Sequence, residues 1–231
     1  MTNNTKPIIF NTEMVKAILD RRKTQTRRPI KLNIKKDNKT NSLNGAVFTI
    51  DNKLYFEHNL IENFSKYKVG DILYVKETWT LGKKFTIKPE NVWYIRNDLG
   101  NEVYYKADLN DNFYDPDNIC KWKPSIHMPK EYARIFLKVT NVRVERLKDI
   151  SDDDCIKEGI KRKIDGSGKS WYSTSIDKEA EYDSQITPFR LLWNSKAKDG
   201  YKWEDNPYVF VYEFERIKLW KKEFVKPLPI G

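Results

Sequence analysis

Apolar residues recur at helical spacing near the start of the chain. The four positions that predict an amphipathic helix are Met14, Val15, Ile18 and Leu19. Asn11 or Thr12 can cap this helix, because a short side-chain oxygen accepts a hydrogen bond from an orphan amide. The next residues, Thr24-Gln25-Thr26, predict that the chain then continues as a strand.

Runs rich in β-branched and aromatic residues predict most of the remaining structure as strands. They cover residues 6–10, 46–50, 53–56, 69–79, 92–95, 103–107, 133–147 and 207–217. We expect one hairpin from residues 46–50 and 53–56, and a second in which 92–95 pairs with 103–107. The face of the fourth strand that carries Leu73, Val75 and Trp79 also carries Glu77. A buried carboxylate needs partners, so Glu77 either forms an ion pair with an arginine of the same sheet or faces a functional site.

Two further helices have clear start and stop signals. The first covers residues 149–159, with Ser151 as its cap, three aspartates in its first turn and Gly159 at its end. Glu158 lies in the last turn, near the negative end of the helix dipole, which invites a nearby cation or a function. The second covers residues 187–194, where Phe189, Leu192 and Trp193 would face the core.

The pattern predicts one domain over residues 1–218, followed by a basic tail at 219–231. We expect insertions at about 31–66, 80–121 and 161–186, the last as a flexible loop or lid. The prolines of residues 122–129 exclude a regular helix or a central strand there. This stiff segment carries Trp122, Lys123 and His127, so it is either a packed loop or a contact for a nucleobase or phosphate.

Composition narrows the class of protein. The chain has 231 residues and a formal net charge of +10, which favours a polyanionic partner such as RNA or DNA, although a basic balance also promotes solubility. Its two cysteines and two histidines have no metal-ligand spacing, so we expect no metal, no cofactor and a reducing compartment. No apolar run approaches the ~20 residues that span a bilayer, so we expect a cytoplasmic protein without a membrane partner.

Five cations lie within eight residues after the first helix: Arg21, Arg22, Lys23, Arg27 and Arg28. Like charges so close together are unfavourable unless water or an anion screens them. The run is therefore either a solvated helix end, where cations are favoured, or an anion-binding site.

Several segments together resemble the ASCH domain, a member of the PUA-like β-barrel superfamily. They are residues 17–27, 69–75, the strand-helix unit that ends at 156–159, and the closing strand 209–214. Arg21 stands where the family usually has glycine. Residues 75–79 and 122–129 resemble the longer ASCH proteins that phages and prophages encode. The resemblance implies an α+β fold, a mostly antiparallel β-barrel with flanking helices, in a bacterial host cytoplasm.

The resemblance also implies chemistry. Small bacterial ASCH proteins include an amidohydrolase that removes the acetyl group from acetylated cytidine, and its catalytic positions correspond to Lys23, Thr26 and Glu158. Lys23 and Thr26 match the motif directly, and Glu158 matches by its place in the helix. A lysine whose pKa neighbouring cations lower can activate a threonine hydroxyl, and Glu158 can orient it or handle the proton of the leaving amine. Other family members bind RNA, and a few cleave it.

We therefore expect a protein that takes a nucleic acid or nucleoside into a basic cleft lined by residues 23–28, with amidohydrolase activity on an acylated pyrimidine nucleoside. The alternative is a non-catalytic RNA- or DNA-binding module, or a phage accessory protein that acts on a host nucleic acid or protein. The expected ligand-binding residues are Arg21, Arg22, Arg27, Arg28, Glu77, Trp79, Tyr105, Lys106, Trp122, Lys123, His127 and Arg134. A straight strand would put Lys23 and Thr26 on opposite faces, so the hydrolase requires a turn or bulge between them, with Lys23 at the helix end.

Overall fold

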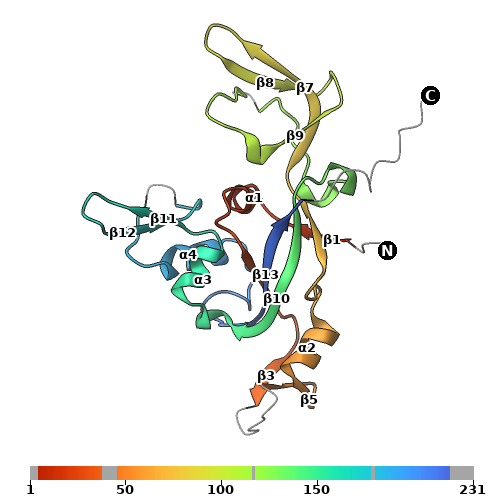
Figure 1. Cartoon of the computed structure of the whole chain (residues 1–231), viewed down its shortest axis with the longest axis vertical. Coiled ribbons are helices and arrows are strands. Elements are labelled where there is room, and N and C mark those ends of the chain that lie inside the picture. The colour runs from red at the N-terminus through yellow and green to blue at the C-terminus, as the bar shows by residue number, and fades with distance from the viewer. Residues whose placement is uncertain (1–4, 38–45, 116–117, 178–179, 219–231) are drawn as a thin grey trace, which may run out of the picture. The chain divides into compact units, whose positions relative to one another are not determined.

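The computed structural model describes residues 5–37, 46–115, 118–177 and 180–218 (Figure 1). The chain divides into two compact units, which we describe separately. Unit 1 comprises Met1–Leu19, Ile72–Leu137 and Arg216–Gly231, and unit 2 comprises Asp20–Asp71 and Lys138–Glu215. The single domain expected over residues 1–218 stays a prediction, and the expected basic tail at 219–231 lies outside the described residues.

Unit 1 begins with a parallel pair of strands and a capped helix. Strand β1 (Thr5–Ile9) pairs with β6 (Ile72–Lys76), and Val75 N–H donates to Ile135 O at 3.0 Å where the next strand, β10 (Phe136–Arg146), begins. Helix α1 (Thr12–Leu19) buries an apolar face. The Asn11 side-chain oxygen accepts from Met14 N–H at 2.8 Å, which confirms the expected cap.

The second sheet of unit 1 has a central strand that the pattern did not indicate. Strand β7 (Trp79–Ile87) lies between β8 (Val92–Arg96) and β9 (Glu102–Tyr105) (Figure 1). The expected hairpin of 92–95 with 103–107 is therefore wrong, because each strand pairs with β7 and not with the other. Exposed lysines interrupt the apolar alternation of β7, and this concealed it. Short 3-10 turns follow: η1 (Lys106–Asp108), η2 (Ser125–His127) and η3 (Lys130–Tyr132).

Unit 2 is built on three strands with two helices. Strand β13 (Tyr208–Ile217) lies between β10 and β2 (Gln25–Pro29), and β2 pairs with it in antiparallel register, Thr26 opposite Tyr212. Helices α3 (Asp152–Lys157) and α4 (Ile186–Asn194), together with η4 (Leu147–Asp149), surround a core cluster that includes Cys155, Phe189 and Val211.

The expected cap and terminating glycine of the acidic helix are confirmed, but α3 spans only Asp152–Lys157 and not the expected 149–159. The Ser151 hydroxyl accepts from Asp154 N–H at 3.1 Å, and Gly159 follows with φ 106°. This positive φ is a conformation that glycine adopts with little strain.

Two smaller sheets and the helix α2 also belong to unit 2. The expected hairpin forms between β4 (Val47–Ile50) and β5 (Lys53–Phe56); β3 (Ile34–Asp37) pairs with β4, and α2 (Glu57–Phe64) follows. Residues 161–186, expected as a flexible loop or lid, instead contain a hairpin of β11 (Lys161–Ile164) and β12 (Ser170–Ser173). Because β11 is exposed on both faces, it has no apolar alternation by which a sequence pattern could identify it.

The expected α+β class agrees with the structure. Strands predominate in the parts of the chain described, and none of the four sheets found there closes into a barrel. Among the same residues, no helix has the length and the apolar character needed to cross a bilayer.

Gly82 tests the sheet of β7, β8 and β9. A Cβ atom at this position would lie 2.6 Å from the Arg96 carbonyl oxygen and 2.6 Å from Cγ2 of Ile95. We expect Gly82→Ala to lower the free energy of unfolding by about 1–3 kcal/mol, because backbone of β8 would have to move. At Gly166 a Cβ meets no atom within 4 Å, so Gly166→Ala should change it by no more than ~0.5 kcal/mol. Urea titrations compare the two, and equal effects would exclude this strand arrangement.

Candidate active site

Helix α3 and strand β2 bring Lys23 and Glu158 together inside unit 2. Thr24 N–H donates to Lys157 O at 2.9 Å, and Phe214 N–H donates to Thr24 O at 2.8 Å, so the residue after Lys23 is held between the helix and β13. These bonds fix the backbone from which Lys23 extends. The arrangement places its side chain against the C-terminal end of α3.

The Lys23 ammonium is buried in a two-point contact with Glu158. Its Nζ donates to Glu158 Oε2 at 2.7 Å and to the Glu158 backbone oxygen at 2.9 Å. Lys23 is 2% exposed and Glu158 is 5% exposed. Burial lowers the pKa of Lys23, and nearby Arg28 and Arg27 act in the same direction, although Glu158 opposes them. A lysine in this setting can lose its proton more readily than one in water.

Arg27 connects three carboxylates. Its guanidinium donates to Glu145 Oε1 through Nε at 3.0 Å, to Asp154 Oδ2 through Nη2 at 2.7 Å and to Glu158 Oε1 through Nη1 at 3.1 Å. The Arg27 side chain is fully buried. Burial acts to lower the pKa of Arg27, but Glu158 and Glu145 outweigh it and the pKa is raised. Arg27 is therefore a permanent cation that holds Glu158 in place.

Arg143 extends the network to the surface of unit 2. It donates to Glu145 Oε2 at 3.1 Å and to Asp154 Oδ2 at 2.7 Å, and it pairs with Glu213. Burial tends to raise the pKa of Asp154, but Arg27 and Arg143 outweigh it and lower the pKa. Cations and carboxylates thus alternate through the network, so each buried charge has an opposite neighbour.

Strand β2 separates its side chains onto two faces. Gln25 and Arg27 face α3, where Gln25 Nε2 donates to Asp154 O at 3.0 Å; its buried Oε1 has no partner among the residues described. Successive side chains in a strand point to opposite faces, so Thr26 and Arg28 face away from α3. Thr26 is 1% exposed and lies opposite Tyr212 in the register.

The expected position of Lys23 at a helix end is wrong. Helix α1 ends at Leu19, and the turn comes at Asp20 and Arg21, before Lys23. Regular pairing of β2 with β13 begins at Gln25, so no bulge lies between Gln25 and Thr26. Arg21 has φ 61°, in the left-handed region that favours glycine.

The remaining cations of the Arg21–Arg28 run differ in environment. Arg21 is exposed, and Arg22 donates to Gly159 O at 2.5 Å and to Asp20 at 3.0 Å. Arg28 is half-buried; burial lowers its pKa, while Glu158, Tyr67 and Tyr212 act to raise it. The run is therefore not a single solvated patch, because Lys23 and Arg27 are interior residues.

Glu77, Tyr105 and Arg134 form a separate cluster in unit 1. Arg134 Nε and Nη2 donate to the two oxygens of Glu77, each at 2.9 Å, and Nη1 donates to Asp108 at 2.6 Å. Arg134 lies over the Tyr105 ring at 3.9 Å. The ion pair expected for Glu77 is thus observed, although Glu77 follows the end of β6 and Arg134 precedes β10, so neither residue lies within a strand. Burial raises the pKa of Glu77 although Arg134 opposes it.

The other expected ligand residues of unit 1 are unequally accessible. Trp79 is 4% exposed, so a base cannot stack on its ring; Lys123 Nζ lies 4.8 Å from the ring centroid. Trp122 is half-buried, whereas Lys106, Lys123 and His127 are exposed. Lys123 thus contacts Trp79, but no described side-chain contact links Lys106, Trp122 or His127 to this pair.

Four residues of the Arg27 network were not predicted from the sequence as site residues: Arg143, Glu145, Asp154 and Glu213. Asp154 was interpreted only as one of three aspartates that complement the helix dipole. A usable signal existed on β10, where Arg143 and Glu145 stand two residues apart on one face. Their partner strand, however, could not be identified from local spacing.

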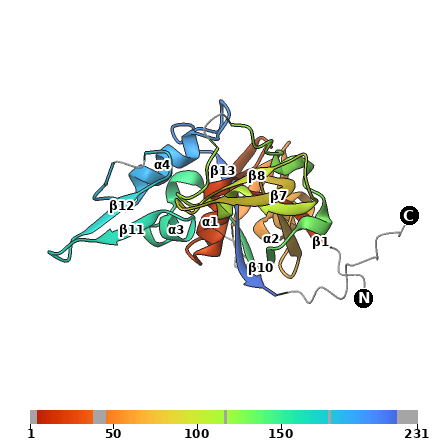
Figure 2. The same cartoon turned by 90° about the horizontal axis from the view of Figure 1, so that it is seen from above.

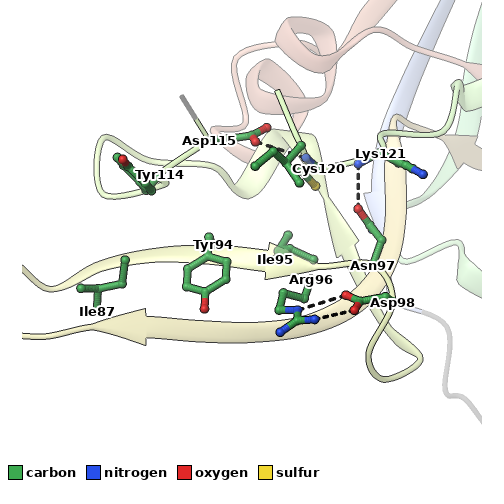
Figure 3. A pocket seen from close by; sticks show the side chains of 11 residues that line it. Ile87, Tyr94, Ile95, Arg96, Asn97, Asp98, Tyr114, Asp115, Cys120 and Lys121 are labelled. Carbon is green, nitrogen blue, oxygen red and sulfur yellow. Dashed lines mark hydrogen bonds and ion pairs between the residues drawn. The ribbon is translucent and has the colours of Figure 1, made fainter. Parts of the chain in front are cut away.

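Figure 3 shows a cavity in unit 1. Its volume is about 650 Å³. Its lining includes the apolar residues Ile87, Tyr94, Ile95 and Ile119, and none of the residues expected to bind a ligand. Arg96 and Asp98 pair with each other there, at 2.5 Å, so their charges are already matched.

No cluster of three His, Cys, Asp or Glu residues in the described ranges could hold a metal ion. Comparisons with protein-family models, with curated proteins and with solved structures found no match for this chain.

Arg27 and Lys157 provide a test of the network, because both contact Asp154. We expect Arg27→Met to lower the free energy of unfolding by about 3–5 kcal/mol, since it leaves three carboxylates without their shared cation. Lys157 is 45% exposed in its side chain, and Lys157→Met should cost no more than ~1 kcal/mol. Urea titrations at pH 7 measure both values. Similar small losses would show that the carboxylates do not depend on Arg27.

Proposed function

We propose that the protein is an ASCH-type amidohydrolase that removes an acyl group from the exocyclic amine of a modified pyrimidine nucleoside. The observation that carries the proposal is the buried Lys23–Glu158 pair, with its Nζ–Oε2 distance of 2.7 Å. A buried lysine with a lowered pKa beside a carboxylate is suited to proton transfer. The ASCH resemblance selects the same two residues.

Two further features support the ASCH assignment. The family usually has glycine at the position of Arg21, and Arg21 adopts the left-handed φ that favours glycine. Strands β2 and β13 are antiparallel, as a PUA-like barrel requires of most of its strands. The barrel, the host cytoplasm and the phage or prophage origin belong to this same proposal.

In the proposed reaction, different residues of unit 2 act as base, as orienting group and as oxyanion stabiliser. Neutral Lys23 takes the proton of the nucleophile as the nucleophile attacks the acyl carbon. Glu158 holds the resulting ammonium, which gives the proton to the amine as the acyl C–N bond breaks. Where water is the nucleophile, the acyl group leaves as a carboxylic acid; where Thr26 is the nucleophile, water then hydrolyses the acyl ester and restores the hydroxyl. Arg27 is held by three carboxylates and therefore orients Glu158. Arg28, on the other face of β2, is the cation assigned to stabilise the oxyanion.

The nucleophile is the least constrained part of the proposal. The resemblance assigns it to the Thr26 hydroxyl, whereas β2 points Thr26 away from the face that carries Arg27. Catalytic contacts often tighten only when substrate binds. Thr26→Val therefore tests the nucleophile separately from the Lys23–Glu158 pair: retained turnover would assign the attack to water.

The direct test is incubation with a panel of N4-acylated cytidines, with release of cytidine followed by chromatography. We expect the wild-type protein to turn over at least one member, and Lys23→Met and Glu158→Gln to lose about a hundredfold or more in rate. Lys157→Met, on the same helix but partly exposed, serves as the matched control and should retain activity. Absence of wild-type turnover, or equal turnover by Lys23→Met, would contradict the proposal and favour the non-catalytic binding module.

The pH dependence of kcat/KM gives an independent test. If neutral Lys23 is the base, the rate rises with pH through the pKa of Lys23, which burial places below its ordinary 10.5. Arg28 contributes to that lowering, so Arg28→Gln should move the rising limb to higher pH. Exposed Arg190 on α4 is the control, and Arg190→Gln should leave the limb in place. A rising limb at the same pH in Arg28→Gln and in the wild type would show that the titrating group is not Lys23.

A further inference from the structure

The β11–β12 hairpin of unit 2, residues 161–173, carries a concentration of exposed cations. We call it the basic ribbon. It extends from the end of α3 as a two-stranded antiparallel arm (Figures 1 and 2). The ribbon contains one aspartate, Asp165, and four cations: Lys161, Arg162, Lys163 and Lys169. Its formal charge is therefore +3. All four residues of β11 are exposed.

One face of the ribbon combines lysines with an aromatic ring. Lys161 lies opposite Ser173 and Lys163 lies opposite Trp171 in the register, so these residues share a face. Lys169 Nζ lies 4.0 Å from the Trp171 ring centroid. The only acidic contact described for these lysines is a surface pair of Lys163 with Glu181 at 3.1 Å. Such exposed pairs are weak and exchange readily for another anion.

Trp171 is held in place by the turn of the ribbon. Its Nε1 donates to Asp165 Oδ2 at 2.7 Å, and Asp165 Oδ1 accepts from Ser167 N–H at 2.8 Å and from Lys169 N–H at 3.1 Å. Asp165 is therefore committed to the turn. A half-exposed indole with a fixed edge offers a ring surface at small entropic cost.

The ribbon is attached directly to the candidate active site. Lys161 follows Glu158 by three residues, and the intervening Ile160 is buried while Lys161 is exposed. Three residues span at most about 10 Å, and here Gly159 turns the chain with φ 106°. Groups that the first lysines contact therefore lie within a few nucleotide lengths of the Lys23–Glu158 pair.

We infer that the basic ribbon binds single-stranded RNA, with its lysines on backbone phosphates and Trp171 stacked on a base next to the nucleotide being processed. The inference rests on the proposed function, and it specifies the substrate as an acylated pyrimidine within an RNA strand. Cations track the phosphates of a single strand, and a ring stacks only on a base that has left a duplex.

The test is fluorescence anisotropy with a labelled, unmodified 12-nucleotide RNA over a series of salt concentrations. The variant Lys161→Ser/Lys163→Ser/Lys169→Ser should bind at least about tenfold more weakly and reduce the slope of log K against log salt by about 2. Trp171→Leu should lower affinity about fivefold to a hundredfold, with the slope unchanged. Circular dichroism and thermal melts confirm that each variant is folded.

The matched control is Lys83→Ser/Lys84→Ser/Lys88→Ser in the β7–β8 region of unit 1. These lysines are also exposed, and their loss changes the net charge equally. The inference predicts less than a twofold effect. Equal losses from the two triple variants would overturn it, as would tighter binding to duplex RNA, to single-stranded DNA or to anionic phosphatidylserine vesicles.

Two measurements separate this inference from the proposed function. Lys23→Met should bind the RNA as the wild type does, because the ribbon is intact. The ribbon variant should process a free acylated cytidine normally but show a raised KM for an acylated RNA oligomer. RNA binding without hydrolysis would refute only the proposed reaction. Hydrolysis with an unchanged KM in the ribbon variant would refute only the ribbon's role.

Discussion

The buried guanidinium of Arg27 is the interaction on which unit 2 depends. It contacts Glu145 from β10 and both Asp154 and Glu158 from the α3 region, so a strand from the sheet edge, a central strand and a helix meet at one cation. Desolvating such charges costs nearly as much as their attraction returns. Because Arg27 lies on β2, a shift in the register of this strand would separate the cation from all three carboxylates, so the network favours the observed register. The same constraint presents Glu158 to Lys23 in a fixed orientation.

Local patterns were sufficient for elements whose signals lie within a few residues. The Asn11 cap, the Ser151 cap and the β4–β5 turn were all predicted because each depends on neighbours along the chain. Strands without apolar alternation were missed, as β7 and β11 show. Both carry exposed lysines on their faces, and such residues give no periodicity from which a strand can be inferred.

The candidate site was predictable only in part, for a related reason. A cation near Glu158 was predictable, because a carboxylate at a helix C-terminus is unfavourable without one. In the structure Glu158 pairs with Lys23 and Arg27. Sequence alone could not separate the interior cations of the Arg21–Arg28 run from the exterior ones. For Arg27 and Arg28 that division arises from the two faces of β2 and from the helix that covers one of them. Asp154 was hidden for the same reason, since only packing distinguishes it from its exposed neighbour Asp153.

The two uses of charge in unit 2 follow from this division. Inside, cations and carboxylates alternate, so little net charge remains to attract a distant anion, and the chemistry available is proton transfer at short range. Outside, the basic ribbon carries unbalanced charge in high-dielectric surroundings, where its field extends over about a Debye length. The chain passes from the buried, charge-paired interior to the exposed ribbon between Glu158 and Lys161. Under the proposed function, a polyanion on the ribbon would lie near a site whose own charges are already paired, so binding and proton transfer would use different cations.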